Sequence, residues 1–152
     1  ITNLQLAAVA GAMGMGVPAA IAAGLRARNR QVICFVGDGG FQMTGNEISV
    51  AIERKLKIRI IVSNNGSLGT IRLYQEKSFP DRTLATNITN PDFVKIAEAY
   101  GMKGFKINKN EDIEITIRQA FEVDGPSLIE VNTSLEYLAA YINMSEIRAS
   151  TK

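Results

Sequence analysis

The chain of 152 residues contains no histidine and no tryptophan, and its single cysteine is Cys34. Without histidine, the chain by itself cannot form a Ser-His-Asp or Cys-His catalytic site, or a zinc site built on histidine. One cysteine cannot form an intramolecular disulfide, which favours a reducing compartment. We therefore expect a cytoplasmic protein with Cys34 in its core, in which any proton relay comes from carboxylates, a cofactor or another polypeptide.

An excess of charge of either sign is also absent. The formal net charge is +2, and no run of lysine and arginine stands out, so we expect no nucleic-acid partner. The longest apolar stretch, residues 4–25, is rich in alanine and glycine and is interrupted by Pro18. It lacks the basic start of a signal peptide, and we expect no membrane span. Hydrophobic and charged contents of 46% and 21% are ordinary for one soluble domain.

Two apolar runs rich in β-branched residues predict buried parallel strands at residues 32–36 and 58–63. Between them, Ile48, Ile52 and Leu56 recur at helical spacing and predict a helix over residues 43–55. This strand-helix-strand unit places the two strands side by side in one sheet. The expected fold class is therefore α/β, with three αβα layers and a mostly parallel sheet.

The remaining elements continue this alternation. Asn90 is expected to cap a helix that has Pro91 at its first position. Further helices are expected at residues 14–28, 68–76, 91–100 and 110–123, further strands at 103–107 and 127–132, a loop at 78–90, and a partly helical tail at 135–152.

Polar residues follow both strands of the first unit. Gly37-Asp38-Gly39 comes directly after the first strand, and Asn64-Asn65 comes directly after the second. A Gly-Asp-Gly segment alone is as easily explained as an ordinary turn. The two motifs together place Asp38 and Asn65 at the carboxyl ends of neighbouring strands, where open α/β sheets bind ligands. Carboxylate and amide oxygens there favour Mg²⁺, with phosphate oxygens as further ligands.

This arrangement resembles the thiamine diphosphate-dependent enzymes, whose signature is Gly-Asp-Gly followed after a gap of this size by Asn-Asn. The similarity to the acetolactate synthase-like group extends from about Gly11 to Val131. Its further segments are residues 11–20, 40–44, 65–72, 90–93, 99–101 and 125–131.

The resemblance implies that residues 1–152 form the diphosphate-binding domain, with thiamine diphosphate and Mg²⁺ as cofactors. The implied metal ligands are the side chains of Asp38 and Asn65 and the backbone carbonyl of Ser67, while Asn64 holds the turn. The residues expected to contact the cofactor are Gly11, Met13, Gly37, Asp38, Gly39, Gly40, Asn65, Ser67, Leu68, Gly69 and Thr70.

Met13 would support the bent cofactor, although a methionine can equally be a gap-filling core residue. A dinucleotide site over residues 11–16 is the other alternative, but Gly-x-x-Gly-x-Gly is the wrong order for one.

The substrate side of the site is less defined. Arg72, Tyr74, Gln75, Lys77 and Arg82 follow the second motif and are candidates for a 2-oxo acid pocket or for solvated surface. Tyr74 stands near the position at which acetolactate synthases carry a characteristic tryptophan. The expected reaction is therefore decarboxylation or carboligation of a 2-oxo acid, with the substrate left open.

No residue of this chain is expected to be catalytic. In the family, a glutamate bonds the pyrimidine ring and drives deprotonation of the cofactor, and it comes from a pyrimidine-binding domain, usually of a neighbouring subunit of a homodimer or homotetramer. We expect that domain, and the first strand of the present one, to lie outside these 152 residues. The alternatives are a non-catalytic or regulatory module that binds thiamine diphosphate, and a nucleotide-binding α/β domain.

Overall fold

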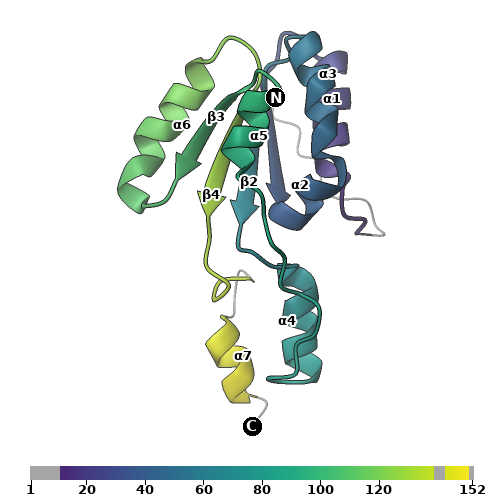
Figure 1. The fold of residues 1–152 in the computed structure, drawn as a ribbon, viewed down its shortest axis with the longest axis vertical. Helices are drawn as coiled ribbons and strands as arrows, with labels where there is room; N and C mark the ends of the chain where they lie inside the picture. Colours follow the sequence, from purple (N-terminus) through teal and green to yellow (C-terminus); the bar gives the residue numbers. More distant parts are fainter. Residues whose placement is uncertain (1–10, 139–142, 151–152) are drawn as a thin grey trace.

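The computed structural model describes residues 11–138 and 143–150. Its sheet has four parallel strands, in the spatial order β1-β2-β4-β3 (Figure 1). They are β1 (Val32–Gly37), β2 (Ile58–Asn64), β3 (Lys103–Ile107) and β4 (Ser127–Asn132). The predicted neighbours β1 and β2 pair directly, with Val32 opposite Ile58.

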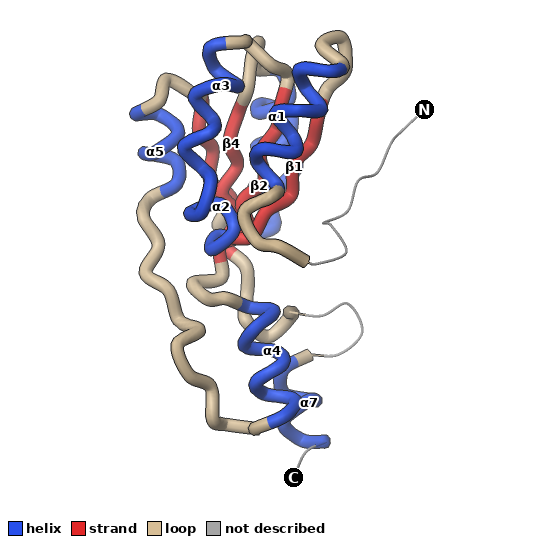
Figure 2. Tube along the Cα trace, turned by 90° about the vertical axis from the view of Figure 1, so that its right-hand side faces the viewer, coloured by secondary structure: helices blue, strands red, loops and turns tan. Residues whose placement is uncertain are grey.

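Helices cover both faces of this sheet. One face carries α1, α2, α3 and α5, and the other carries α6 (Figures 1 and 2). The helices are α1 (Gly16–Arg26), α2 (Asp38–Thr44), α3 (Ile48–Glu53), α4 (Gly69–Ser78), α5 (Phe93–Ala99), α6 (Ile113–Glu122) and α7 (Met144–Ser150), with 3-10 turns at Gly45–Glu47 and Asn110–Asp112. The predicted three-layer α/β fold is confirmed.

The main core lies under the helices of the first face. Ile58, Ile60 and Val62 of β2 are fully buried there, and each contributes roughly 1.5–3 kcal/mol. Phe41 and Phe93 meet edge to face, with ring centroids 5.4 Å apart, and so tie α2 to α5. Cys34 is buried as expected, and burial raises the pKa of its thiol to about 11.

The helix expected from residue 43 begins earlier. Helix α2 starts at Asp38, immediately after β1, and the 3-10 turn Gly45–Glu47 separates it from α3. Gly45 lies so close to Phe41 that an added Cβ would be 2.6 Å from its ring. The predicted single helix is therefore wrong, because the aromatic ring packs where the chain turns.

Two further expectations are wrong. Asn90 does not cap α5, because Asp92 accepts the hydrogen bond from the backbone N–H of Lys95 at 3.0 Å. Strand β1 is buried on one face only, and its Ile33 and Phe35 are 49% and 77% exposed. The reason is that β1 is an edge strand, while α6 packs against β3 and β4.

Beyond the carboxyl ends of the strands lie α4 and α7 (Figure 1). These two helices pack against each other through Leu73, Met144 and Ile147. Between α4 and α5, the chain returns towards the sheet along one side of the molecule (Figure 2). Of the expected partly helical tail, residues 144–150 form α7, and residues 139–142 and 151–152 lie outside the described residues. Within the described ranges, no helix is long and apolar enough to cross a membrane.

An ion pair with a buried carboxylate joins α4 to α7. The Glu76 side chain is fully buried, and both of its oxygens accept hydrogen bonds from Arg148. The Arg148 guanidinium holds the pKa of the Glu76 carboxyl below its usual range. Since the folded-state pKa is lowered, this stabilisation is present above the unfolded-state pKa and is lost as the pH falls through the folded-state pKa.

We predict that Arg148→Met lowers the free energy of unfolding at pH 7 by about 1–3 kcal/mol. The difference from the unsubstituted protein should shrink below about pH 4, as Glu76 becomes protonated. Denaturant unfolding at several pH values measures this difference. Arg118→Met is the matched control, because the exposed pair of Arg118 with Glu114 is worth about 0.5 kcal/mol or less. A pH-independent loss in Arg148→Met would contradict the prediction.

Candidate functional site

The two polar motifs meet at the carboxyl ends of β1 and β2. Asp38 begins α2 directly after β1, and Asn64 ends β2. The Asp38 Oδ2 accepts hydrogen bonds from the backbone N–H groups of Asn65 at 3.2 Å and Gly66 at 2.8 Å. The structure therefore joins the predicted motifs through the carboxylate of Asp38.

The carboxylate of Asp38 is buried among neutral donors, with 2% of the residue exposed. Its Oδ2 accepts a third hydrogen bond, from the Asn90 side chain at 2.6 Å, whereas Oδ1 accepts only one, from the Gly39 N–H at 2.9 Å. Among the described residues no lysine or arginine forms an ion pair with Asp38. A buried carboxylate without a cation is costly, and the spare lone pair of Oδ1 suits a hard metal ion.

The second motif forms a tight turn. The Asn65 Oδ1 accepts a hydrogen bond from the Ser67 N–H at 3.0 Å, and Gly66 between them has a φ of +65°. Ser67 is buried, and its hydroxyl donates to the Thr86 carbonyl at 2.8 Å. The described part of the chain has no cluster of three or more histidine, cysteine, aspartate or glutamate side chains suited to a metal. A metal at Asp38 would therefore need amide and carbonyl oxygens such as those of this turn.

Asn64 and two unpredicted residues complete the polar cluster. The Asn64 Oδ1 accepts hydrogen bonds from the Gly66 N–H at 3.3 Å and from the Asn90 amide at 2.7 Å. The Gln42 amide in turn donates to the Asn90 Oδ1 at 2.6 Å. Sequence reasoning missed Asn90 and Gln42 as site residues. The residue before a proline favours an extended backbone, and this was the available signal that Asn90 stands outside the helix.

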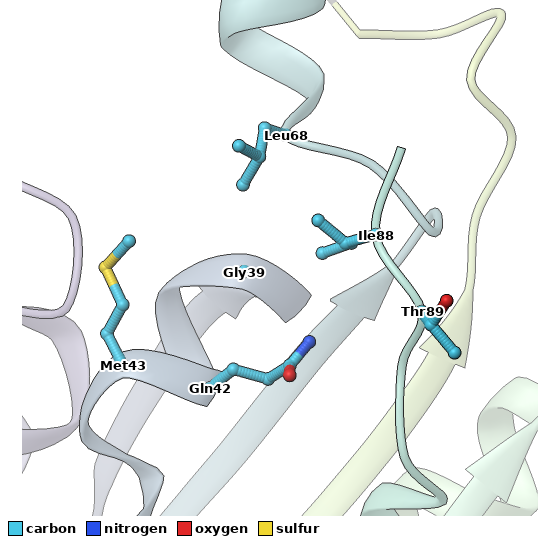
Figure 3. Close-up of a pocket in the computed structure, with 6 residues that line it drawn as sticks. All are labelled: Gly39, Gln42, Met43, Leu68, Ile88 and Thr89. Carbon is cyan, nitrogen blue, oxygen red and sulfur yellow. The ribbon is translucent and has the colours of Figure 1, made fainter. Parts of the chain in front are cut away.

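A cavity of about 400 Å³ lies beside this cluster. Its lining residues come from α2, from the residue before α4 and from the loop before α5 (Figure 3). Of these, only Gly39 and Leu68 were predicted to contact the cofactor. The cavity is lined by Gly39, Gln42, Met43, Leu68, Ile88 and Thr89. An added Cβ at Gly39 would lie 2.7 Å from Leu68 Cδ2 and 3.3 Å from Met13 Cε. The apolar side chains of Met13 and Leu68 therefore converge where Gly39 leaves space.

The other predicted contacts differ in burial and in backbone position. Met13 is 43% exposed, so the alternative that it fills a gap in the core is wrong. Gly37 is the residue before α2, and Gly40 lies within α2. Gly11 has a φ of +61° and is exposed. Leu68, Gly69 and Thr70 form the amino end of α4.

The candidate substrate residues contact α4 itself and the loop that follows it. Arg72 donates to Asn87 at 2.8 Å, and Gln75 exchanges two hydrogen bonds with the backbone of Leu84. Lys77 lies over the ring of Tyr74, and Arg82 lies over the ring of Phe79. Of the candidates Arg72, Tyr74, Gln75, Lys77 and Arg82, none lines the described cavity. A role in substrate binding therefore remains a prediction for all five.

Residues 2–131 match the family model "Thiamine pyrophosphate enzyme, C-terminal TPP binding domain". The chain is 41% identical over 122 residues to the acetolactate synthase large subunit of Lactococcus lactis, covering 80% of this chain and 21% of that protein. It is 37% identical over 122 residues to the large subunit of Porphyra purpurea, covering 79% of this chain and 21% of that protein. The chain thus spans about a fifth of the length of these relatives.

A solved structure is similar to this chain in both sequence and fold. It is the thiamine diphosphate-dependent 4-hydroxybenzoylformate decarboxylase of Rhodococcus jostii RHA1, which is 34% identical and matches with a TM-score of 0.77. The match covers 82% of this chain and 24% of that chain. The similarity therefore includes both the sequence and the arrangement of the sheet and its helices.

We predict that Gly39→Ala weakens thiamine diphosphate binding by tenfold or more, because the new methyl group displaces Leu68 and Met13 into the cavity. Folding stability should change by no more than about 1 kcal/mol, because alanine is the better helix former. Calorimetric titration and thermal unfolding of the intact enzyme measure the two quantities. Gly24→Ala in α1 is the control, with its Cβ near Ile58 and Leu56 instead. Equal cofactor affinity in both variants would contradict the prediction.

Proposed function

The chain belongs to the thiamine pyrophosphate enzymes, as their C-terminal cofactor-binding domain of acetolactate synthase-like type, and from this premise we propose that it binds thiamine diphosphate through Mg²⁺. The observation that carries the proposal is the buried Asp38 carboxylate, which is held by neutral donors and has a spare lone pair on Oδ1. A divalent cation bound there would supply the missing positive charge.

Three residues would hold the metal. They are Asp38 through Oδ1, Asn65 through its side-chain oxygen and Ser67 through its backbone carbonyl. The one hydrogen bond accepted by the Asn65 Oδ1 leaves it a lone pair for a second partner. These are oxygen ligands, which Mg²⁺ prefers, and diphosphate oxygens commonly complete its shell.

The diphosphate would lie between the first turns of α2 and α4. Gly39 and Gly40 bring the backbone of α2 close without side chains. The amino end of α4 begins at Gly69, and it favours negative charge because its first N–H groups point outward. Met13 and Leu68 would offer apolar contact to the rings of the cofactor.

The cofactor, when bound, supplies the carbanion-stabilising chemistry by which 2-oxo acids are decarboxylated or joined to a second carbonyl compound. The residues of this chain would bind and orient it, with Met43, Leu68 and Ile88 as the apolar part of the cavity lining. The named relatives include synthases and a decarboxylase. We therefore propose a lyase or transferase acting on a 2-oxo acid, without choosing between decarboxylase and carboligase.

The complete site would need a second domain. We propose that a pyrimidine-binding domain of a neighbouring subunit supplies the catalytic glutamate, in a cytoplasmic homodimer or homotetramer. The alternative of a non-catalytic module that binds thiamine diphosphate predicts that the full-length protein lacks this glutamate. Sequencing the complete gene and assaying 2-oxo acid decarboxylation distinguish the two.

We predict that Asp38→Asn in the intact enzyme weakens Mg²⁺-dependent binding of thiamine diphosphate by at least 100-fold, or about 2.7 kcal/mol. The change keeps the size of the side chain but removes the charge that attracts the metal. Calorimetric titration with the cofactor, with and without Mg²⁺, gives the affinities. Asp92→Asn is the control, because asparagine caps a helix as well as aspartate does and Asp92 caps α5. Unchanged affinity in Asp38→Asn would rule out the metal assignment.

A further inference from the structure

A chain of hydrogen bonds crosses the sheet and ends on Asp38. It starts at Lys106 of β3, whose Nζ lies 3.0 Å from the Glu130 Oε1 of β4. The same Oε1 accepts a hydrogen bond from the Asn64 amide of β2 at 2.8 Å. The Asn90 amide then donates to the Asn64 Oδ1 at 2.7 Å and to the Asp38 Oδ2 at 2.6 Å. Three strands and the loop before α5 are thus connected to one carboxylate.

The carboxylates of Glu130 and Asp38 fix the orientation of the two asparagine amides that lie between them. Glu130 is 1% exposed and is paired with Lys106, so its carboxylate only accepts hydrogen bonds. The Asn64 NH₂ must therefore face Glu130, which turns its oxygen towards Asn90. The Asn90 NH₂ faces that oxygen and Asp38, and its own oxygen receives the Gln42 amide. A reversed Asn90 would place its oxygen against the carboxylate of Asp38.

The donors on Asp38 distinguish its two oxygens. Oδ2 accepts three hydrogen bonds, from the backbone of Asn65 and Gly66 and from the side chain of Asn90. Oδ1 accepts one, from the adjacent Gly39 N–H. The bond from Asn90 is the shortest of the three, at 2.6 Å against 2.8 Å from Gly66 and 3.2 Å from Asn65. Oδ2 is therefore fully used, whereas Oδ1 keeps a lone pair for a further partner.

We propose that Asn90 is a positioning residue of the metal site, and that Glu130 and Asn64 fix the direction in which it donates. As the donor closest to Oδ2, Asn90 keeps the Asp38 carboxylate turned so that Oδ1 faces the metal. This inference rests on the proposed function, since it concerns the same metal. The competing explanation is that Asn90 only holds the loop before α5 against β2. It predicts an effect on folding stability but none on metal affinity.

The test uses Asn90→Leu in the full-length enzyme. Leucine has a similar volume and carries no hydrogen-bond donor. The measurement is the Mg²⁺ dissociation constant, from calorimetric titration at a fixed concentration of thiamine diphosphate. We expect it to rise by about 10- to 100-fold, the range found when a partner behind a metal ligand is removed.

Asn132→Leu is the matched control, because Asn132 is an amide at the same edge of the sheet that pairs with Asn108 and not with Asp38. Its Mg²⁺ dissociation constant should equal that of the unsubstituted enzyme. Thermal unfolding of the metal-free proteins separates folding effects from metal binding. A lower unfolding midpoint in Asn90→Leu with an unchanged Mg²⁺ dissociation constant would overturn the inference.

Glu130 provides a second test remote from the metal. Glu130→Gln keeps an oxygen that accepts from Asn64, and it should bind Mg²⁺ nearly as tightly as the unsubstituted enzyme. Glu130→Leu removes that acceptor and should weaken Mg²⁺ binding, although it touches neither the metal nor Asp38. Equal affinities in these two variants would overturn the role given to Glu130.

The outcomes separate this inference from the function on which it rests. If the unsubstituted enzyme binds thiamine diphosphate with Mg²⁺ and Asn90→Leu does so equally well, only the positioning role is overturned. If the unsubstituted enzyme shows no metal-dependent binding, both the proposed function and this inference are overturned.

Discussion

The candidate site depends on one buried carboxylate. Asp38 stands where β1 ends and α2 begins, and its Oδ2 accepts hydrogen bonds from the turn after β2 and from the loop before α5. These segments are far apart in the sequence, and hydrogen bonds of Gly66, Ser67 and Leu68 to the loop before α5 also join them. Asp38 adds the one charged group of this cluster, at the backbone that the proposed metal and diphosphate need.

Burying the Asp38 carboxylate without a cation costs free energy. Neutral amides stabilise a buried carboxylate less well than a positive charge does, and elsewhere in this chain buried acids have such partners. Glu76 is paired with Arg148 and Glu130 with Lys106. The contrast between these acids and Asp38 is the physical reason to expect a metal at Asp38, because binding a cation repays the cost of burying the charge.

Hydrophobic patterning predicted the α/β fold because buried strands and amphipathic helices are local features of sequence. It also predicted that Asp38 and Asn65 meet, since parallel strands end at one edge. It did not predict the exposure of Phe35, which depends on how far α6 extends over the sheet. The role of Asn90 was missed for a similar reason: its partners Asp38 and Asn64 are distant in sequence, and helix capping offered a local explanation.

The most direct test is a calorimetric titration of the full-length enzyme with thiamine diphosphate, in the presence of Mg²⁺ and then with the metal removed by chelation. The account predicts tight binding with Mg²⁺ and a loss of at least 100-fold, or about 2.7 kcal/mol, without it. Binding that is equally tight without metal, or displacement of the cofactor by an adenine nucleotide, would contradict it.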